Sequence, residues 1–121
     1  MLLVWRIVQL KSDAEPWWFL DGWEKDIVDE WHFSSKDEAF NFYSDKMTDK
    51  QTKYEYVRVK RGTQVAFWNK EEFFFCDDCD EDLQVYHGFI LFHLDAPFTK
   101  ETMNAEEQSF FEKIFTHKNE A

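Results

Sequence analysis

The segment that decides the fold is YEYVRVKRGTQVAFW, residues 54–68. Residues 54–60 and 64–68 are rich in β-branched and aromatic side chains, which favour strands. Arg61 and Gly62 separate the two stretches, and a glycine at such a break indicates a turn. We therefore expect a β-hairpin here, which places two antiparallel strands side by side.

Four further strand-like stretches flank this hairpin. Residues 2–10 are apolar apart from a few polar positions, and residues 27–33 combine β-branched and aromatic residues in imperfect alternation. After the hairpin, residues 73–76 form a short stretch and residues 83–94 a long apolar run. Gly88 lies inside that run, where a glycine indicates a bulge or a close backbone approach.

Two helices are expected outside these strands. Ser35 and Glu38 match a capping box, in which each side chain bonds the other residue's free backbone N–H. An apolar stripe then follows at helical spacing, formed by Ala39, Phe40, Tyr43 and Met47. This helix is expected to end near Asp49. A second capping pattern at Asn104 and Glu107 predicts a C-terminal helix with a narrow apolar face of Phe111, Ile114 and Phe115.

The expected order of elements is β-β-α-β-β-β-β-α. Helices set apart from runs of strands are typical of the α+β class. We expect a mainly antiparallel sheet of about five to six strands, with one helix after strand two and a C-terminal helix. One in five of the 121 residues is aromatic, which supplies enough apolar area for one core. The chain is therefore expected to form a single domain, residues 1–121.

The sequence predicts a cytoplasmic protein. It contains no run of about 18 apolar residues, so no membrane-spanning helix is expected. The N-terminal stretch lacks the basic region and the small-residue cleavage site of a signal peptide. Two cysteines only three positions apart do not make the disulfide framework of a secreted scaffold.

The charge is strongly negative overall and unevenly distributed. A net charge of −11 disfavours general binding to nucleic acids or anionic membranes. Residues 46–70 nevertheless hold seven basic residues against two acids, whereas residues 71–82 hold seven acids and no base. The simplest interpretation is two solvated surfaces of opposite sign. The alternative is a nucleic-acid platform of basic and aromatic side chains, formed by Tyr54, Tyr56, Arg58, Lys60 and Arg61.

Cys76 and Cys79 form the sharpest chemical motif. Two cysteines at this spacing can bind one tetrahedral Zn²⁺, and His87 is a candidate third ligand from the next strand. The fourth ligand would be a carboxylate, another histidine or a second chain; the candidates are Asp77, Asp80, His32 and His93. A thioredoxin-like role is disfavoured, because the surrounding acids oppose thiolate formation. The simplest interpretation is two reduced thiols in a turn.

An aromatic segment, residues 17–23, is the second candidate site. Gly22 interrupts it, so it is expected on a turn or a short strand. Trp17, Trp18 and Trp23 beside Glu15 are candidates for a partner-binding aromatic pocket. The alternative is that these rings simply pack into the core.

Three patches of the sequence together resemble a known family. They are Glu15-Pro16-Trp17-Trp18-Phe19 with Trp23 and Asp26-Ile27; Phe67-Trp68; and Cys76-x-x-Cys79-Asp80-Glu81-x-Leu83-Gln84-x-Tyr86-His87. The chain resembles the family of small bacterial proteins known as domain of unknown function 1033, found mostly in low-GC Gram-positive bacteria. The resemblance implies no catalytic residues, although members are often labelled DNA-binding. The net charge of −11 conflicts with that label.

We expect a non-enzymatic protein-binding or adaptor module that needs no cofactor. The sequence lacks a glycine-rich phosphate loop, a Gly-x-Ser-x-Gly motif and a His-Glu-x-x-His motif. One alternative is a nucleic-acid-associated protein that uses residues 46–70. A second alternative is a structural zinc or thiol site at the Cys-x-x-Cys turn.

Overall fold

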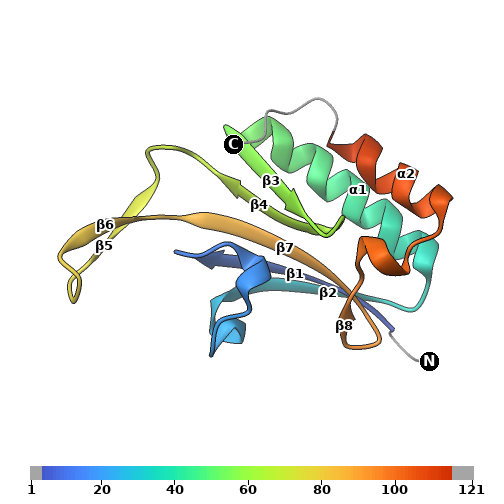
Figure 1. Ribbon diagram of the computed structural model, residues 1–121, viewed down its shortest axis with the longest axis horizontal. Coiled ribbons are helices and arrows are strands. Elements are labelled where there is room, and N and C mark those ends of the chain that lie inside the picture. Colours follow the sequence, from blue (N-terminus) through green and yellow to red (C-terminus); the bar gives the residue numbers. More distant parts are fainter. Residues whose placement is uncertain (1–3, 116–121) are drawn as a thin grey trace.

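Six antiparallel strands form the main sheet of the computed structural model, which describes residues 4–115 (Figure 1). The order across the sheet is β2 (Ile27–Phe33), β1 (Trp5–Ser12), β7 (Tyr86–His93), β4 (Gln64–Trp68) and β3 (Tyr56–Lys60), and β8 (Ala96–Pro97) also pairs with β7. Two helices lie apart from these strands in the sequence. The predicted α+β class with a mainly antiparallel sheet is therefore confirmed.

The predicted hairpin forms between β3 and β4. Tyr56 lies opposite Trp68 and Lys60 opposite Gln64, so the two strands pair without a bulge. Arg61 and Gly62 adopt φ angles of 54° and 89°. The loop has three residues, 61–63, and positive φ at the first two reverses the chain between the paired Lys60 and Gln64. The turn chemistry and the strand propensity therefore agree, which is why this segment was predictable.

The long apolar run at residues 83–94 is not one strand, so that expectation is wrong. It is divided between β6 (Glu81–Gln84) and β7, with Val85 at the break. The Val85 N–H donates to the Glu72 carbonyl at 3.0 Å, which continues the pairing of β5 with β6 by one residue. Strand β6 instead pairs with β5 (Phe73–Cys76) in a separate two-stranded ribbon. This ribbon projects from one end of the main sheet (Figure 1).

Both predicted helices are present. Helix α1 (Lys36–Lys53) begins where expected, and the Ser35 Oγ accepts a 3.3 Å hydrogen bond from the Glu38 N–H. It continues past Asp49, because an Asp49–Lys53 ion pair of 3.1 Å supports the last turn. Helix α2 (Ala105–Ile114) begins with a complete capping box between Asn104 and Glu107. Among residues 4–115, no helix combines the length and the apolar character that crossing a membrane requires.

The sheet is covered on both faces. Helices α1 and α2 cover one face, and their side chains pack there with those of β1, β4 and β7 around Phe40, Tyr43 and Phe111. The segment between β1 and β2 covers part of the other face (Figure 1). It contains two short 3₁₀ helices in place of the predicted turn or short strand, η1 (Pro16–Trp18) and η2 (Trp23–Asp26). A third, η3 (Lys100–Thr102), precedes α2.

Replacement of Ser35 by alanine is expected to lower the free energy of unfolding by about 1 kcal/mol, because the Glu38 N–H loses its acceptor. Urea denaturation followed by circular dichroism measures this loss. Ser34→Ala is the matched control, since the neighbouring serine is exposed and lies outside the cap. Equal midpoints for the two variants would show that the Ser35 cap does not stabilise α1.

Candidate binding surface

Alternation along β3 places three side chains on the face of the sheet opposite the helices. Tyr56, Arg58 and Lys60 point to this side, while Val57 and Val59 contact the helical core. Trp68 on β4 lies directly across from Tyr56, and their rings stack at 5.6 Å. Because β3 is an edge strand of the main sheet, these side chains form a rim at that edge.

A close backbone approach holds η1 against the same face. A Cβ at Gly88 would lie 2.8 Å from the Cβ and Cγ of Pro16, so only glycine permits this contact. Trp17 is consequently buried against the sheet, whereas the next side chain, Trp18, is 58% exposed. Phe19 then adopts a φ of 46° and ends the short helix. Of the two alternatives expected at Gly88, a bulge or a close backbone approach, the structure therefore shows the close approach.

The contacts between η1 and β3 join two candidate sites that the sequence analysis treated separately. Glu15 accepts hydrogen bonds from the Trp18 Nε1–H at 3.3 Å and from the Arg58 Nη1 at 3.4 Å. The Lys60 ammonium lies over the rings of Trp17 and Trp18, at 5.9 and 5.7 Å from their centroids. Such cation–π contacts are worth about 0.5–1 kcal/mol each at exposed sites. Glu15, Trp17 and Trp18 of the predicted partner site therefore lie on one surface with Arg58 and Lys60 of the predicted basic platform.

We call this surface the cationic face; it comprises Glu15, Trp17, Trp18, Tyr56, Arg58, Lys60, Trp68 and Tyr86. Tyr86 on β7 extends it, because its ring meets that of Trp68 edge-on at 5.4 Å. Burial, and to a smaller extent the Glu15 carboxylate, raise the pKa of Tyr86, so its hydroxyl stays neutral at physiological pH. Arg61 lies at the far end of the face, where its Nη1 donates to Gln64 at 3.2 Å.

Two residues predicted for this region lie elsewhere. Tyr54 follows the last turn of α1 rather than lying in β3, and its ring packs on the helical side against Phe67 and His87. Trp23 packs on Phe19 at 5.2 Å and on Phe92 at 6.1 Å, away from the other two tryptophans. The predicted three-tryptophan pocket does not form. The hollow beside Trp23 is only about 30 Å³, which is the space of a single water molecule.

The two cysteines lie at the tip of the β5–β6 ribbon and form a disulfide, Cys76–Cys79, in place of the two reduced thiols expected. His87 does not join them. It lies opposite Phe67 in the main sheet, whereas Cys76 lies opposite Glu81 at the far end of the ribbon. The predicted ligand set is therefore not assembled, and residues 4–115 contain no cluster of three or more His, Cys, Asp or Glu side chains placed to hold a metal ion.

His87 instead anchors the base of the ribbon. Its Nε2 lies 2.9 Å from a carboxylate oxygen of Glu72, and its ring packs on Tyr54 at 4.7 Å. The Gln84 amide donates to the carbonyls of Asn69 and Glu72, at 2.8 and 2.9 Å. These bonds fix the direction in which the ribbon leaves the body of the protein.

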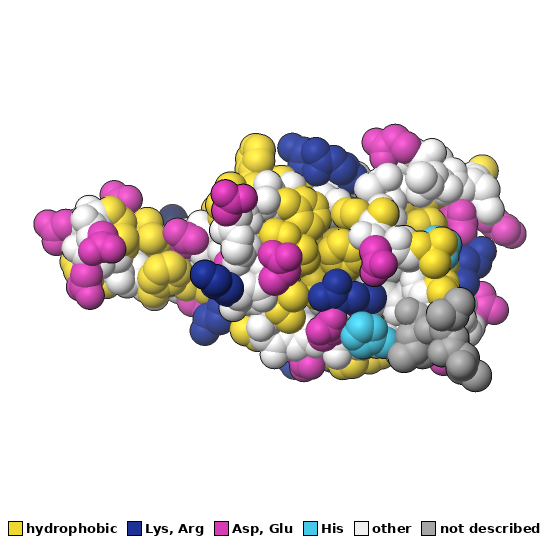
Figure 2. All heavy atoms as spheres, turned by 90° about the horizontal axis from the view of Figure 1, so that it is seen from below, with side chains coloured by type: hydrophobic (Ala, Val, Ile, Leu, Met, Phe, Trp, Pro, Cys, Tyr) yellow, Lys and Arg dark blue, Asp and Glu magenta, His cyan; other side chains and the backbone are white. Residues whose placement is uncertain are grey.

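We call residues 71–84 the acidic arm. Three consecutive aromatic side chains on it are half-exposed, namely Phe73, Phe74 and Phe75 at 51%, 44% and 54%. Its acids are Glu71, Glu72, Asp77, Asp78, Asp80, Glu81 and Asp82. Figure 2 shows the arm as a lobe outside the main body, with acidic side chains around hydrophobic ones. The acids and the cysteines are evident in the sequence, but the exposure of the three phenylalanines is not, because a Phe run in a strand normally indicates burial.

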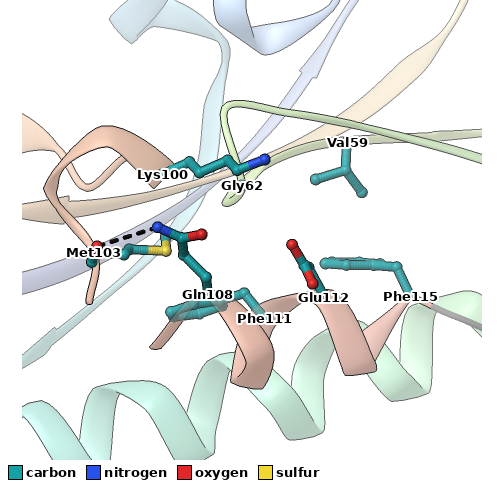
Figure 3. A pocket seen from close by; sticks show the side chains of 8 residues that line it. All are labelled: Val59, Gly62, Lys100, Met103, Gln108, Phe111, Glu112 and Phe115. Atoms are coloured by element: carbon teal, nitrogen blue, oxygen red, sulfur yellow. Dashed lines mark hydrogen bonds between the residues drawn. The ribbon is translucent and has the colours of Figure 1, made fainter. Parts of the chain in front are cut away.

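The best-formed hollow lies on the helical side, between β3, η3 and α2 (Figure 3). Its volume is about 270 Å³, just below the usual range for small-molecule sites. Met103 and Phe111 form an apolar floor, while Lys100 and Glu112 are exposed at the rim. The Gln108 amide donates to the Met103 carbonyl at 3.2 Å (Figure 3). The hollow therefore combines an apolar floor with the polar ends of Lys100, Gln108 and Glu112 (Figure 3).

A family model described as "Protein of unknown function (DUF1033)" matches residues 4–120, which is nearly the whole chain. No curated protein and no solved structure matches the chain.

Replacement of Gly88 by alanine is expected to displace η1 from the sheet, because the new methyl group would overlap Pro16. We expect a loss of about 1–3 kcal/mol in the free energy of unfolding, as for other overpacked sites. Tryptophan fluorescence should shift to longer wavelength as Trp17 becomes exposed. Ala66→Gly, at the position paired with Gly88, is the control that changes backbone propensity without adding bulk. An unshifted spectrum in Gly88→Ala would contradict the close approach.

Proposed function

The chain belongs to DUF1033, a family of proteins of unknown function, and from this premise we propose that it is a non-enzymatic protein-binding module that uses the cationic face. The observation that carries the proposal is Trp18, a 58% exposed indole held in place by Glu15 and lying under Lys60. Tryptophan, tyrosine and arginine are the residue types that dominate binding energy at protein interfaces.

The arrangement of charges on the face also supports binding over catalysis. The Glu15 carboxylate accepts hydrogen bonds from Trp18 and Arg58, so it is engaged in holding those side chains. Arg58 in turn lies over the Trp68 ring at 5.8 Å. Side chains fixed by their neighbours are pre-organised, which lowers the entropy lost when a partner binds.

Replacement of Trp18 by alanine is expected to weaken partner binding by at least about tenfold, the effect of losing an interface anchor worth about 1.4 kcal/mol or more. Partners captured from native lysate by the tagged wild-type protein would be purified, and their dissociation constants measured by calorimetry. Val28→Ala is the matched control, since Val28 is 57% exposed on β2, at the opposite edge of the sheet.

We expect the control to change the dissociation constant by less than about twofold, because isolated surface substitutions are usually nearly neutral. Equal affinities for the wild type and Trp18→Ala would exclude the cationic face as the contact surface. Circular dichroism of each variant separates a binding effect from a loss of folding.

Binding of nucleic acid is the second candidate function, favoured by one specific observation. The stacked rings of Tyr56 and Trp68, with Arg58 and Lys60 beside them, have the composition of a base-stacking platform. The net charge of −11 opposes this function, because the rest of the surface repels a polyanion.

We therefore expect no binding to generic duplex DNA tighter than about 10⁻⁵ M at physiological salt. Gel-shift titration over a range of salt concentrations tests this directly. A salt-dependent shift at sub-micromolar protein that Arg58→Ala and Lys60→Ala both weaken would favour the nucleic-acid function over protein binding. A shift insensitive to these two substitutions would place the DNA contact elsewhere on the protein.

A further inference from the structure

The acidic arm has no cover of its own. A two-stranded ribbon by itself is marginally stable in water, and this one pairs with no strand of the main sheet in the described chain. Its tip is closed by the Cys76–Cys79 disulfide, and its base is held by the Gln84 and His87 hydrogen bonds. The arm is therefore a fixed projection that presents three half-exposed phenylalanines and two open strand edges.

The charge of the arm specifies what can cover those aromatic side chains. Residues 71–82 carry seven acids and no base, so an acidic or neutral surface would leave the carboxylates uncompensated on contact. The surface that fits is apolar or aromatic at its centre and basic around it. A partner of this kind attracts the arm before contact and covers the phenylalanine rings after it.

The chain itself carries a surface of this kind. The cationic face presents Arg58, Lys60 and the adjoining Arg61, and the Glu15 carboxylate pairs with Arg58. The aromatic side chains of Trp18, Tyr56, Trp68 and Tyr86 lie between and beside these cations. The ribbon also fits along the strand, since its four pairs span roughly 10 Å and the five residues of β3 roughly 13 Å.

We propose that the acidic arm of one copy docks on the cationic face of a second copy, which docks its own arm in return. This inference rests on the proposed role of the cationic face as a protein-binding surface, and it names a second copy of the chain as a partner. Each copy offers one arm and one face, so two identical contacts close a two-fold dimer. The net charge of −11 opposes association, and the local attraction between the arm and the face must outweigh this repulsion, which physiological salt screens beyond about 8 Å.

Docking of the arm covers the same tryptophan and cations that another protein would contact. Self-association and partner binding therefore compete for one surface. In the dimer the cationic face is covered by the arm of the other copy and cannot bind another protein. Since the contact is made between opposite charges, the dimer should dissociate as the salt concentration rises.

Charge reversal on both sides of the contact tests the proposal. The arm-reversed variant is Asp77→Lys/Asp78→Lys, at two exposed positions, and the face-reversed variant is Arg58→Glu/Lys60→Glu. Analytical ultracentrifugation of the whole protein should give a concentration-dependent rise from 14.8 kDa to about twice that mass for the wild type. Each reversed variant should remain a monomer, with its dimer dissociation constant raised by at least about tenfold.

Mixing the two variants in equal amounts should restore association, because the acidic arm of the face-reversed variant then faces the unchanged cationic face of the arm-reversed variant, and the two introduced lysines face the two introduced glutamates. The control for the arm-reversed variant is Asp45→Lys/Glu112→Lys. It makes the same change in net charge as the arm reversal, at exposed positions of the helical layer, and should dimerise like the wild type. Circular dichroism confirms that each variant is folded before sedimentation is compared.

A wild type that stays monomeric over the whole concentration series overturns the proposal. A dimer that survives arm reversal, or a mixture of folded variants that fails to re-associate, overturns it as well. These failures are distinct from failure of the proposed function. A monomeric wild type whose partner binding still depends on Trp18 would leave the cationic face as a binding surface and remove only self-association.

Discussion

Burial of β7 on both of its faces is the constraint on which the rest of the structure depends. The strand is hydrogen-bonded to β1 on one side and to β4 on the other, and residues 87–92 are all buried. Its sequence is apolar toward both faces, so neither face can be left to water. Phe89 and Leu91 require α1 and α2, while Ile90 and Phe92 require the segment between β1 and β2.

The candidate binding surface follows from this need for cover. Pro16 packs directly on the backbone at Gly88, which brings η1 down onto the second face of the sheet. Trp17 is buried in that contact, and Trp18, the next residue, is left outside under Lys60. The pairing of an exposed indole with a cation is thus a consequence of how the second face is closed. The acidic arm lies outside the main sheet, on the N-terminal side of Val85. No other element covers the side chains of Phe73, Phe74 and Phe75 there in the described chain.

Opposite charge is therefore separated within one small chain. The basic residues within 58–61 lie at the edge of the main sheet, whereas the acids within 71–82 lie on the projecting arm. Local fields of opposite sign on one molecule favour contacts between copies or with a partner that repeats one of them. The Glu72–His87 contact and the Gln84 hydrogen bonds hold the base of the arm, so this separation is built into the fold.

The sequence by itself determined the features that depend on neighbouring residues. The β3–β4 hairpin, the start of α1 at Ser35 and the capping box of α2 were predictable, because turn chemistry, caps and periodicity act over a few positions. Tertiary structure alone decided the rest. The division of residues 83–94 at Val85 depends on strand pairing, because β6 pairs with β5 whereas β7 pairs with β1 and β4. The separation of His87 from Cys76 and Cys79 depends on the same pairing. The contact between Trp18 and Lys60 joins residues about forty positions apart in the sequence, so no pattern of neighbouring residues predicts it.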